Sequence, residues 1–314
     1  MRTYILKRLG QSVIVFLLIC FLSYMILFLI PGDPVYSMYG ANITQEQYQM
    51  YYEQLQLDQP LVVRFSNWFL NFMKGDFGYS TKYRIDVNQL IGDRLPVTMW
   101  IGIWSLVITA VVGILFGVIA AVTRGRWQDN VITVFANVGS TVPLFWLGVL
   151  GVYIFSIKLG WLPSSGYTSP FKDLGMNVKQ SLMPVIAMAF CQVATIARLT
   201  RSNMLEVINE DYVRTARAKG LTENAVLVGH VIPNAISPII NMIGMLFRVV
   251  VAGSVAIEKV FNIPGMGQLM VNSITSKDVN PLQACIVIIS AVVLIVNLIV
   301  DVIYALVDPR IRLH

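Results

Sequence analysis

The sequence predicts an all-α integral membrane protein in which about six hydrophobic helices span a bilayer. Of its 314 residues, 56% are hydrophobic and only 13% are charged, whereas soluble domains carry roughly 25% charged residues. The mean hydropathy is +0.68, and the apolar residues form long blocks rather than an amphipathic pattern. A single soluble core does not need that much apolar surface, so the blocks are interpreted as membrane spans.

Six segments have the length and composition of a span, for which about 20 mostly apolar residues are needed. They cover residues 9–30, 97–122, 131–158, 182–199, 236–257 and 284–307. The apolar stretch of the first exceeds the roughly 7–15 residues of a signal-peptide core, so it is interpreted as a retained span. The fourth is the least apolar, because Gln192 and Thr195 interrupt it.

The charges of the loops predict that both termini lie in the cytoplasm. With that orientation the inner segments hold twelve Lys and Arg residues and the short outer loops hold five, as the positive-inside rule requires. The net charge of +6 is then explained by basic residues that anchor helix ends at anionic lipid, and no nucleic-acid partner is expected. The three cysteines lie in apolar runs and the two histidines are far apart, so neither a disulfide framework nor a metal site is expected.

The spans and loops divide the chain into three regions. Residues 1–30 form the N-terminal tail and first span, residues 31–96 form a long extracytoplasmic loop, and residues 97–314 form a core of five helices. In the long loop, Thr44 and Gln47 predict a capping box for a short helix that reaches about Leu57. Pro60 is placed to open a second helix with an aromatic face. A small lid is favoured over a substrate-sensing role.

The inner loop between the fourth and fifth spans predicts a short polar helix at about 209–221. Asn209 is a suitable N-cap, Glu210 and Asp211 follow in the first turn, and Lys219 precedes a stop at Gly220. This helix is too polar to span and too short to be stable alone in water. It must therefore rest on lipid headgroups or on a protein.

Four residues within or next to the spans are candidates for a pathway or gate. A charge such as Arg248 inside a membrane is costly and marks a functional hypothesis. A rise of about 1.5 Å per residue puts Arg248 at a different depth from Asp301, so Arg248 is expected to face the pathway or a carboxylate of another subunit. Pro143 predicts a kink in the third span, interpreted as packing rather than a gate. Gln192 and Glu258 complete the set, and an interfacial pair of Glu258 with Lys259 is the alternative interpretation there.

Several stretches, in order along nearly the whole chain, resemble the membrane-spanning subunits of ABC importers, in the dipeptide, oligopeptide and nickel permease branch. The inner loop matches that branch through the segment Asp211-Tyr-Val-Arg-Thr-Ala-Arg-Ala-Lys-Gly-Leu221, although Arg214 and His230 depart from the general importer motif. The other matching stretches are Pro31-Gly32-Asp33-Pro34, Leu57-Asp58-Gln59-Pro60, Gly75-Asp76-Phe77-Gly78, Ile257-Glu258-Lys259-Val260-Phe261, Pro264-Gly265-Met266-Gly267 and Asp308-Pro309-Arg310-Ile311-Arg312. The long first loop is similar to that of the B-type subunit.

The resemblance implies a type I importer fold in a bacterial or archaeal cytoplasmic membrane. It implies three kinds of partner: a second, homologous permease, two cytoplasmic ATPase subunits, and an extracytoplasmic binding protein. The polar helix would be the coupling helix that docks on an ATPase, with Val213, Ala216 and Leu221 available for contact. Its candidate coupling residues are Glu210, Asp211, Arg214, Thr215, Ala216, Arg217, Lys219 and Gly220. Glu258 would belong to an outer gating segment.

The chain itself is not expected to be an enzyme or to bind a cofactor. It has no G-x-x-x-x-G-K-[ST] phosphate loop, so ATP and Mg²⁺ are expected on the partner ATPases. Peptides are the expected cargo, with nickel or a metal chelate as the alternative within the family. A self-sufficient ion-coupled transporter is disfavoured because no internal repeat and few buried acids are seen. An intramembrane enzyme is disfavoured because no catalytic motif falls within the spans.

Overall fold

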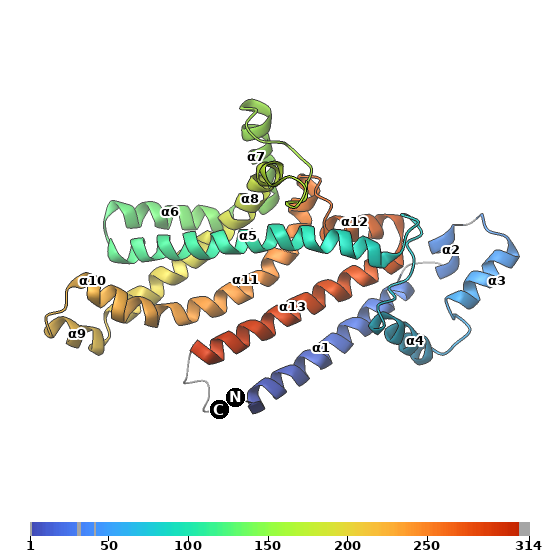
Figure 1. Cartoon of the computed structure of the whole chain (residues 1–314), viewed down its shortest axis with the longest axis horizontal. Helices are drawn as coiled ribbons and strands as arrows, with labels where there is room; N and C mark the ends of the chain where they lie inside the picture. The colour runs from blue at the N-terminus through green and yellow to red at the C-terminus, as the bar shows by residue number, and fades with distance from the viewer. Residues whose placement is uncertain (1, 30–32, 41, 308–314) are drawn as a thin grey trace. The chain divides into compact units, whose positions relative to one another are not determined.

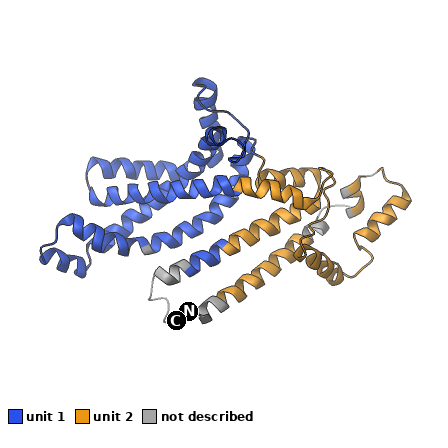
Figure 2. Ribbon diagram, viewed as in Figure 1, with its two compact units in different colours: residues 1, 99–263, 296–314 blue, residues 2–98, 264–295 orange. Residues whose placement is uncertain are grey.

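The computed structural model describes residues 2–29, 33–40 and 42–307, and the chain folds into two compact units (Figures 1 and 2). Unit 1 comprises residues 1, 99–263 and 296–314, and unit 2 comprises residues 2–98 and 264–295. The units do not follow the order of the sequence, because residues 264–295 group with the N-terminal part. The motifs at Pro31-Gly32 and Asp308–Arg312 lie outside the described residues.

The all-α class is confirmed, and all six predicted spans are helical. Five are continuous helices: α1 (Arg2–Leu29), α5 (Val87–Val122), α8 (Leu174–Ile208), α11 (Ile232–Val260) and α13 (Val279–Val307). Each contains a window apolar enough to cross a membrane. The weakly apolar fourth span is α8, and 56% of its most apolar window is buried inside the chain, against 17% for α1. Its polar residues are tolerated because α8 is surrounded by other helices.

The third span is broken rather than kinked, which corrects the prediction of one helix over 131–158. It consists of α6 (Trp127–Thr141), then α7 (Leu144–Gly151) and a π-helical turn, η1 (Val152–Lys158). The two halves meet at an angle of 103°. Pro143 lies between them and has no N–H to donate to the preceding turn. At the end of α6 the carbonyl of Val138 accepts both the N–H of Val142 at 3.2 Å and the hydroxyl of Thr141 at 3.0 Å.

Unit 1 is held together by close approaches to α8. A Cβ at Gly113 of α5 would lie 2.7 Å from the Cβ of Ile196, and one at Gly117 would meet Thr200. Gly139 of α6 faces Ala194 in the same way. Small residues at a spacing of four, as at Gly113 and Gly117, allow two helices to approach closely, and here the approaching helix is α8.

Unit 2 contains the helices of the predicted lid, called the lid helices below, which are α2 (Pro34–Tyr39), α3 (Gln45–Gln54) and α4 (Leu61–Met73), together with α12 (Met266–Ser276). The predicted capping box is confirmed, since Gln47 and Thr44 exchange two hydrogen bonds at 3.2 and 2.9 Å. The predicted aromatic face of α4 is also confirmed. Phe72 is buried, and Phe65, Trp68 and Phe69 pack partly buried against the same cluster.

Candidate functional site

The predicted coupling helix is α9 (Asp211–Ala218), at the end of unit 1 where α8 stops (Figure 1). It begins slightly later than the sequence suggested. Glu210 occupies the N-cap position without a side-chain cap bond, while Asn209 terminates α8 and its side chain donates to the carbonyl of Leu205. Asn209 is therefore not the N-cap of α9. The stop at Gly220 is confirmed by its φ of +83°, a conformation that favours glycine.

The apolar side of α9 is turned toward its own chain. Val213 is 0% exposed and Ala216 is buried beside it. Both belong to a cluster with Met204 of α8 and Val226 of α10 (Glu223–Val226). The expectation that Val213 and Ala216 contact a partner is therefore wrong. Val213 and Ala216 pack α9 against its own chain. Of the three expected contact residues only Leu221 is exposed, at 43%.

The polar side of α9 is open. The exposed residues of the predicted set are Glu210, Asp211, Arg214, Thr215, Arg217, Lys219 and Gly220. Arg214 lies 3.3 Å from the carboxylate of Asp211, with side-chain exposures of 77% and 94%, so this pair adds little to stability. The apolar side of α9 is packed against its own chain, and its exposed side carries both positive and negative charges. Such a surface is suited to docking on another protein.

Arg217 fixes the position of α9 through a contact that sequence reasoning missed. Its guanidinium lies 2.7 Å from the carboxylate of Glu223 on α10 and donates a second bond at 3.4 Å to the carbonyl of Ile208 at the end of α8. One local feature of the sequence could have placed Glu223 at the start of a helix near Arg217. Thr222 is the N-cap of α10, and its hydroxyl accepts a hydrogen bond from the N–H of Ala225.

A second missed contact joins α8 to α6. Arg201 donates to both carboxylate oxygens of Asp129, at 2.6 and 2.9 Å. Asp129 is buried and also accepts from the N–H of Gly125 at 3.0 Å. No short-range pattern signals this pair, since 72 residues separate its members.

The four pathway candidates do not form one cluster. Gln192 lines a cavity of about 230 Å³ with Val142 and Leu144, the neighbours of Pro143, and with Val249, the neighbour of Arg248. Arg248 and Pro143 are exposed on the chain and do not line that cavity.

Arg248 forms no ion pair among the described residues, and its separation from Asp301 stays a prediction. Glu258 is 1% exposed whereas Lys259 is exposed. The interpretation of these two residues as an interfacial surface pair is therefore wrong.

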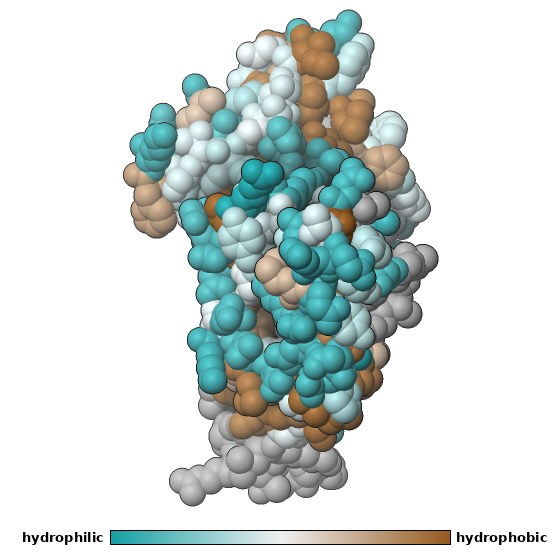
Figure 3. All heavy atoms as spheres, turned by 90° about the vertical axis from the view of Figure 1, so that its right-hand side faces the viewer, coloured by the Kyte–Doolittle hydropathy of each residue, from teal (hydrophilic) through white to brown (hydrophobic). Residues whose placement is uncertain are grey.

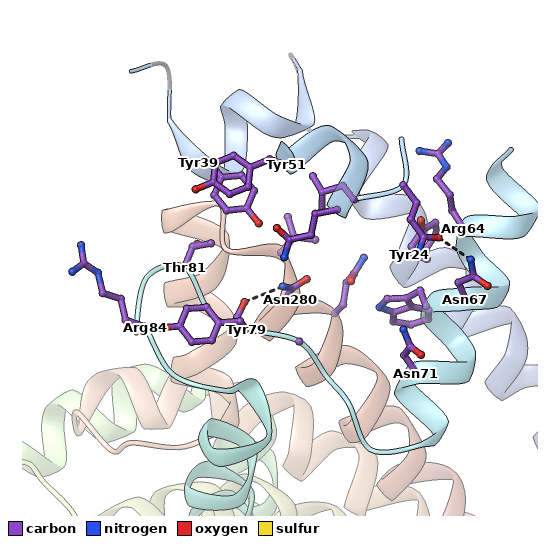
Figure 4. Close-up of a pocket in the computed structure, with 17 residues that line it drawn as sticks. Tyr24, Tyr39, Tyr51, Arg64, Asn67, Asn71, Tyr79, Thr81, Arg84 and Asn280 are labelled. Atoms are coloured by element: carbon purple, nitrogen blue, oxygen red, sulfur yellow. Dashed lines mark hydrogen bonds between the residues drawn. The ribbon is translucent and has the colours of Figure 1, made fainter. Parts of the chain in front are cut away.

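A larger cavity, of about 660 Å³, lies within unit 2 (Figure 4). It is bordered by the lid helices, by residues 78–84 and by the start of α13. The end of the unit that carries α2, α3 and α4 presents a largely hydrophilic surface (Figure 3). Within the described part of the chain, no group of three or more His, Cys, Asp or Glu residues is arranged to hold a metal ion.

Comparison with known proteins identifies the family. Residues 113–313 match the family described as the binding-protein-dependent transport system inner membrane component. Residues 1–102 match its N-terminal region. The chain belongs to this family. It is therefore a membrane-spanning permease of an ABC importer, a transport component rather than an enzyme, that works with ATPase subunits and a binding protein.

Relatives and solved structures agree with the assignment. A putative peptide transport system permease protein of Brucella abortus is 39% identical over 313 residues, which are 99% of each chain. A probable peptide ABC transporter permease protein of Sinorhizobium fredii is 37% identical over 99% of this chain and 100% of its own. The glutathione transport system permease protein of Salmonella choleraesuis is 37% identical over 99% of each.

The fold is shared with a solved transporter. The inward-facing MetNI methionine ABC transporter has a TM-score of 0.58 and 19% identity over 70% of this chain and 97% of its own. At this identity the match shows the fold alone, and it supports the type I permease architecture expected from the sequence.

Proposed function

We propose that this permease carries short peptides and forms half of a translocation pathway with a second, homologous permease. The observation that carries the proposal is similarity along the whole chain to permeases named for peptide transport, at 37 to 39% identity. A further relative is named for glutathione, which is itself a tripeptide. None of these relatives is named for nickel.

Coupling to ATP hydrolysis is assigned to the α9 surface. The helix is seated by Val213 and Ala216 and held in place by the Arg217–Glu223 ion pair. Its exposed charged side chains can then contact a groove on a cytoplasmic ATPase subunit. Two copies of that subunit are expected in the complex. A movement of the ATPase would pass directly into α8, because only two residues separate the end of α8 from α9.

Transport by the reconstituted complex tests the proposal. Proteoliposomes would contain this permease, its partner permease and the ATPases, with ATP inside and binding protein outside. Peptide bound to the purified binding protein would be identified by mass spectrometry. We expect ATP-dependent uptake of that peptide. Uptake of Ni²⁺ instead of peptide would replace the cargo assignment, and uptake by this chain without any ATPase would overturn the importer mechanism.

A further inference from the structure

The walls of the cavity in unit 2 are held in place by specific side-chain hydrogen bonds. One wall is the segment 78–84, held to the start of α13. The buried carboxylate of Asp278 accepts from the hydroxyl of Ser80 at 2.6 Å and from the N–H of Lys82 at 3.0 Å. Asn280 donates to the carbonyl of Tyr79 at 2.9 Å (Figure 4). These bonds fix the wall along several residues.

The opposite wall and the roof come from the lid helices. Asn67 of α4 donates to the side chain of Gln56 at 2.8 Å (Figure 4). The rings of Tyr39 and Tyr51 stack at 3.7 Å with an interplanar angle of 2°, and both rings line the cavity. Tyr39 also packs against the buried Val279 of α13, so the roof is joined to the first wall.

The described lining residues are rich in hydrogen-bonding groups and carry no negative charge. Arg64 and Arg84 lie on opposite sides of the cavity (Figure 4), and among the described residues no Asp or Glu lines it. Asp278 stands behind the wall and is engaged by Ser80 and Lys82. The remaining polar groups are mostly side-chain amides and phenols. The amides are those of Gln54, Gln56, Asn67, Asn71, Asn280 and Gln283.

Two of these amides keep bonding capacity for a ligand. Gln283 is only 3% exposed, and its amide nitrogen donates at 3.4 Å to the carbonyl of Ser23, while its carbonyl oxygen has no partner among the described residues. The side-chain amide of Asn71 also has no hydrogen bond among them. A side-chain amide can make up to four hydrogen bonds, and Gln283 makes one to the described residues, so it retains bonding capacity for a polar ligand.

Backbone strain concentrates at the same place. Among the described residues, four non-glycine residues have positive φ, and two of them, Gln56 (52°) and Arg84 (55°), line the cavity. Such conformations persist where the surrounding structure enforces them, and they cluster at binding sites.

We propose that this cavity binds a short peptide, with its free carboxylate at an arginine and its backbone amides paired to the lining amides. The volume lies within the range of about 300–1,000 Å³ that is usual for small-ligand sites. The tyrosines and Trp68 provide apolar faces for peptide side chains. A divalent transition metal would require imidazole, thiolate or carboxylate ligands, and the lining residues that the structure describes have none of these. The identity of the ligand rests on the proposed function.

Direct binding to the assembled transporter tests the site. The complex in nanodiscs, without binding protein or ATP, would be titrated with radiolabelled trialanine and with its C-terminal amide. We expect saturable binding of trialanine and about tenfold weaker binding of the amide, because one charge-assisted hydrogen bond is lost. Absence of saturable trialanine binding would overturn the proposal.

Variants place the binding in this cavity rather than in the membrane pathway. Arg84→Gln and Asn71→Leu are each expected to weaken trialanine binding about tenfold. Lys74→Gln, which removes one positive charge from an exposed position outside the cavity, should leave it unchanged. Asn71 is exposed, and its side chain makes no hydrogen bond to the described residues. Asn71→Leu is therefore expected to fold, and it still tests the site if Arg84→Gln does not fold. Equal affinity in both cavity variants and the wild type would refute the site.

ATP-driven peptide uptake, measured on the same preparations, separates this inference from the proposed function. Uptake without cavity binding would refute only the cavity. If the variants weaken docking of the binding protein but not trialanine affinity, the cavity is a protein contact and the peptide site is refuted. Loss of all peptide uptake, with Ni²⁺ uptake in its place, would refute the proposed function itself.

Discussion

Arg201 of α8 donates hydrogen bonds to both carboxylate oxygens of Asp129 on α6, at 2.6 and 2.9 Å. Asp129 begins the span that breaks at Pro143, and Arg201 lies seven residues before the end of α8, close in sequence to α9. The pair therefore joins α8, the helix that leads into the proposed coupling surface of α9, to the broken third span.

Loss of this pair should destabilise unit 1. Asp129→Asn removes a charge-assisted bidentate contact, and we expect the free energy of unfolding to fall by about 1–2 kcal/mol. This value is kept low because the Arg201 side chain is 32% exposed and solvent screens such pairs. Thermal unfolding in detergent measures the effect. Asp211→Asn, at a pair that is almost fully exposed, is the matched control and should leave the melting temperature unchanged.

Two arginines of α9 should respond differently to charge reversal. Arg217→Glu breaks the ion pair with Glu223 and should reduce ATP-driven uptake, while the double variant Arg217→Glu, Glu223→Arg should restore it, because the contact is re-formed with reversed polarity. Arg214→Glu acts on the exposed surface and should lose uptake without any rescue within the chain. Proteoliposome transport measures both. Failure of the double variant would mean that Arg217 contacts the ATPase itself.

Arg248 should be required for transport and not for assembly. It is exposed on the isolated chain and has no ion pair among the described residues, which suits a group that faces the pathway. Replacement by Met keeps an unbranched, flexible side chain and removes the charge. We expect impaired peptide uptake with an intact complex on size-exclusion chromatography. Loss of assembly would instead assign Arg248 to a subunit interface.

Two glycines of α5 should show opposite effects. Gly117→Ala places a Cβ against Thr200 and the carbonyl of Ala197, and overpacking of this kind costs about 1–3 kcal/mol. Gly92→Ala meets nothing within 4 Å and should stabilise the helix by about 0.5–1 kcal/mol through backbone entropy. Thermal unfolding of the two variants checks the contrast, and equal melting temperatures would contradict the close α5–α8 contact.

One tyrosine of the predicted lid, Tyr48, should lose its phenolic proton at a higher pH than an ordinary tyrosine. The Tyr48 hydroxyl donates to the carboxylate of Asp33 at 2.7 Å, and this hydrogen bond raises the pKa of Tyr48 to about 12. A raised pKa means that the bond contributes fully below the usual tyrosine pKa of about 10 and is lost as the pH rises through about 12. The ultraviolet titration of Tyr48→Phe, subtracted from that of the wild type, should show a step near pH 12. A step near pH 10 would show that the bond does not form.

The sequence by itself determined the features that rest on local periodicity and composition. Long apolar blocks identified every span, because a spanning helix satisfies its own backbone hydrogen bonds and needs only an apolar surface. Local chemistry also located the capping box at Thr44 and the stop at Gly220. The motif at 211–221 indicated the importer family through its residue types and their spacing alone.

Only the tertiary structure decided which faces are buried and which distant residues meet. It turned Val213 and Ala216 inward, where the sequence had assigned them to a partner, because the amphipathic pattern of a helix does not say which protein covers its apolar side. It also paired Arg201 with Asp129 and closed the unit 2 cavity between lid, loop and α13. Contacts of this kind join residues 72 to about 200 positions apart, and no pattern within one segment specifies them.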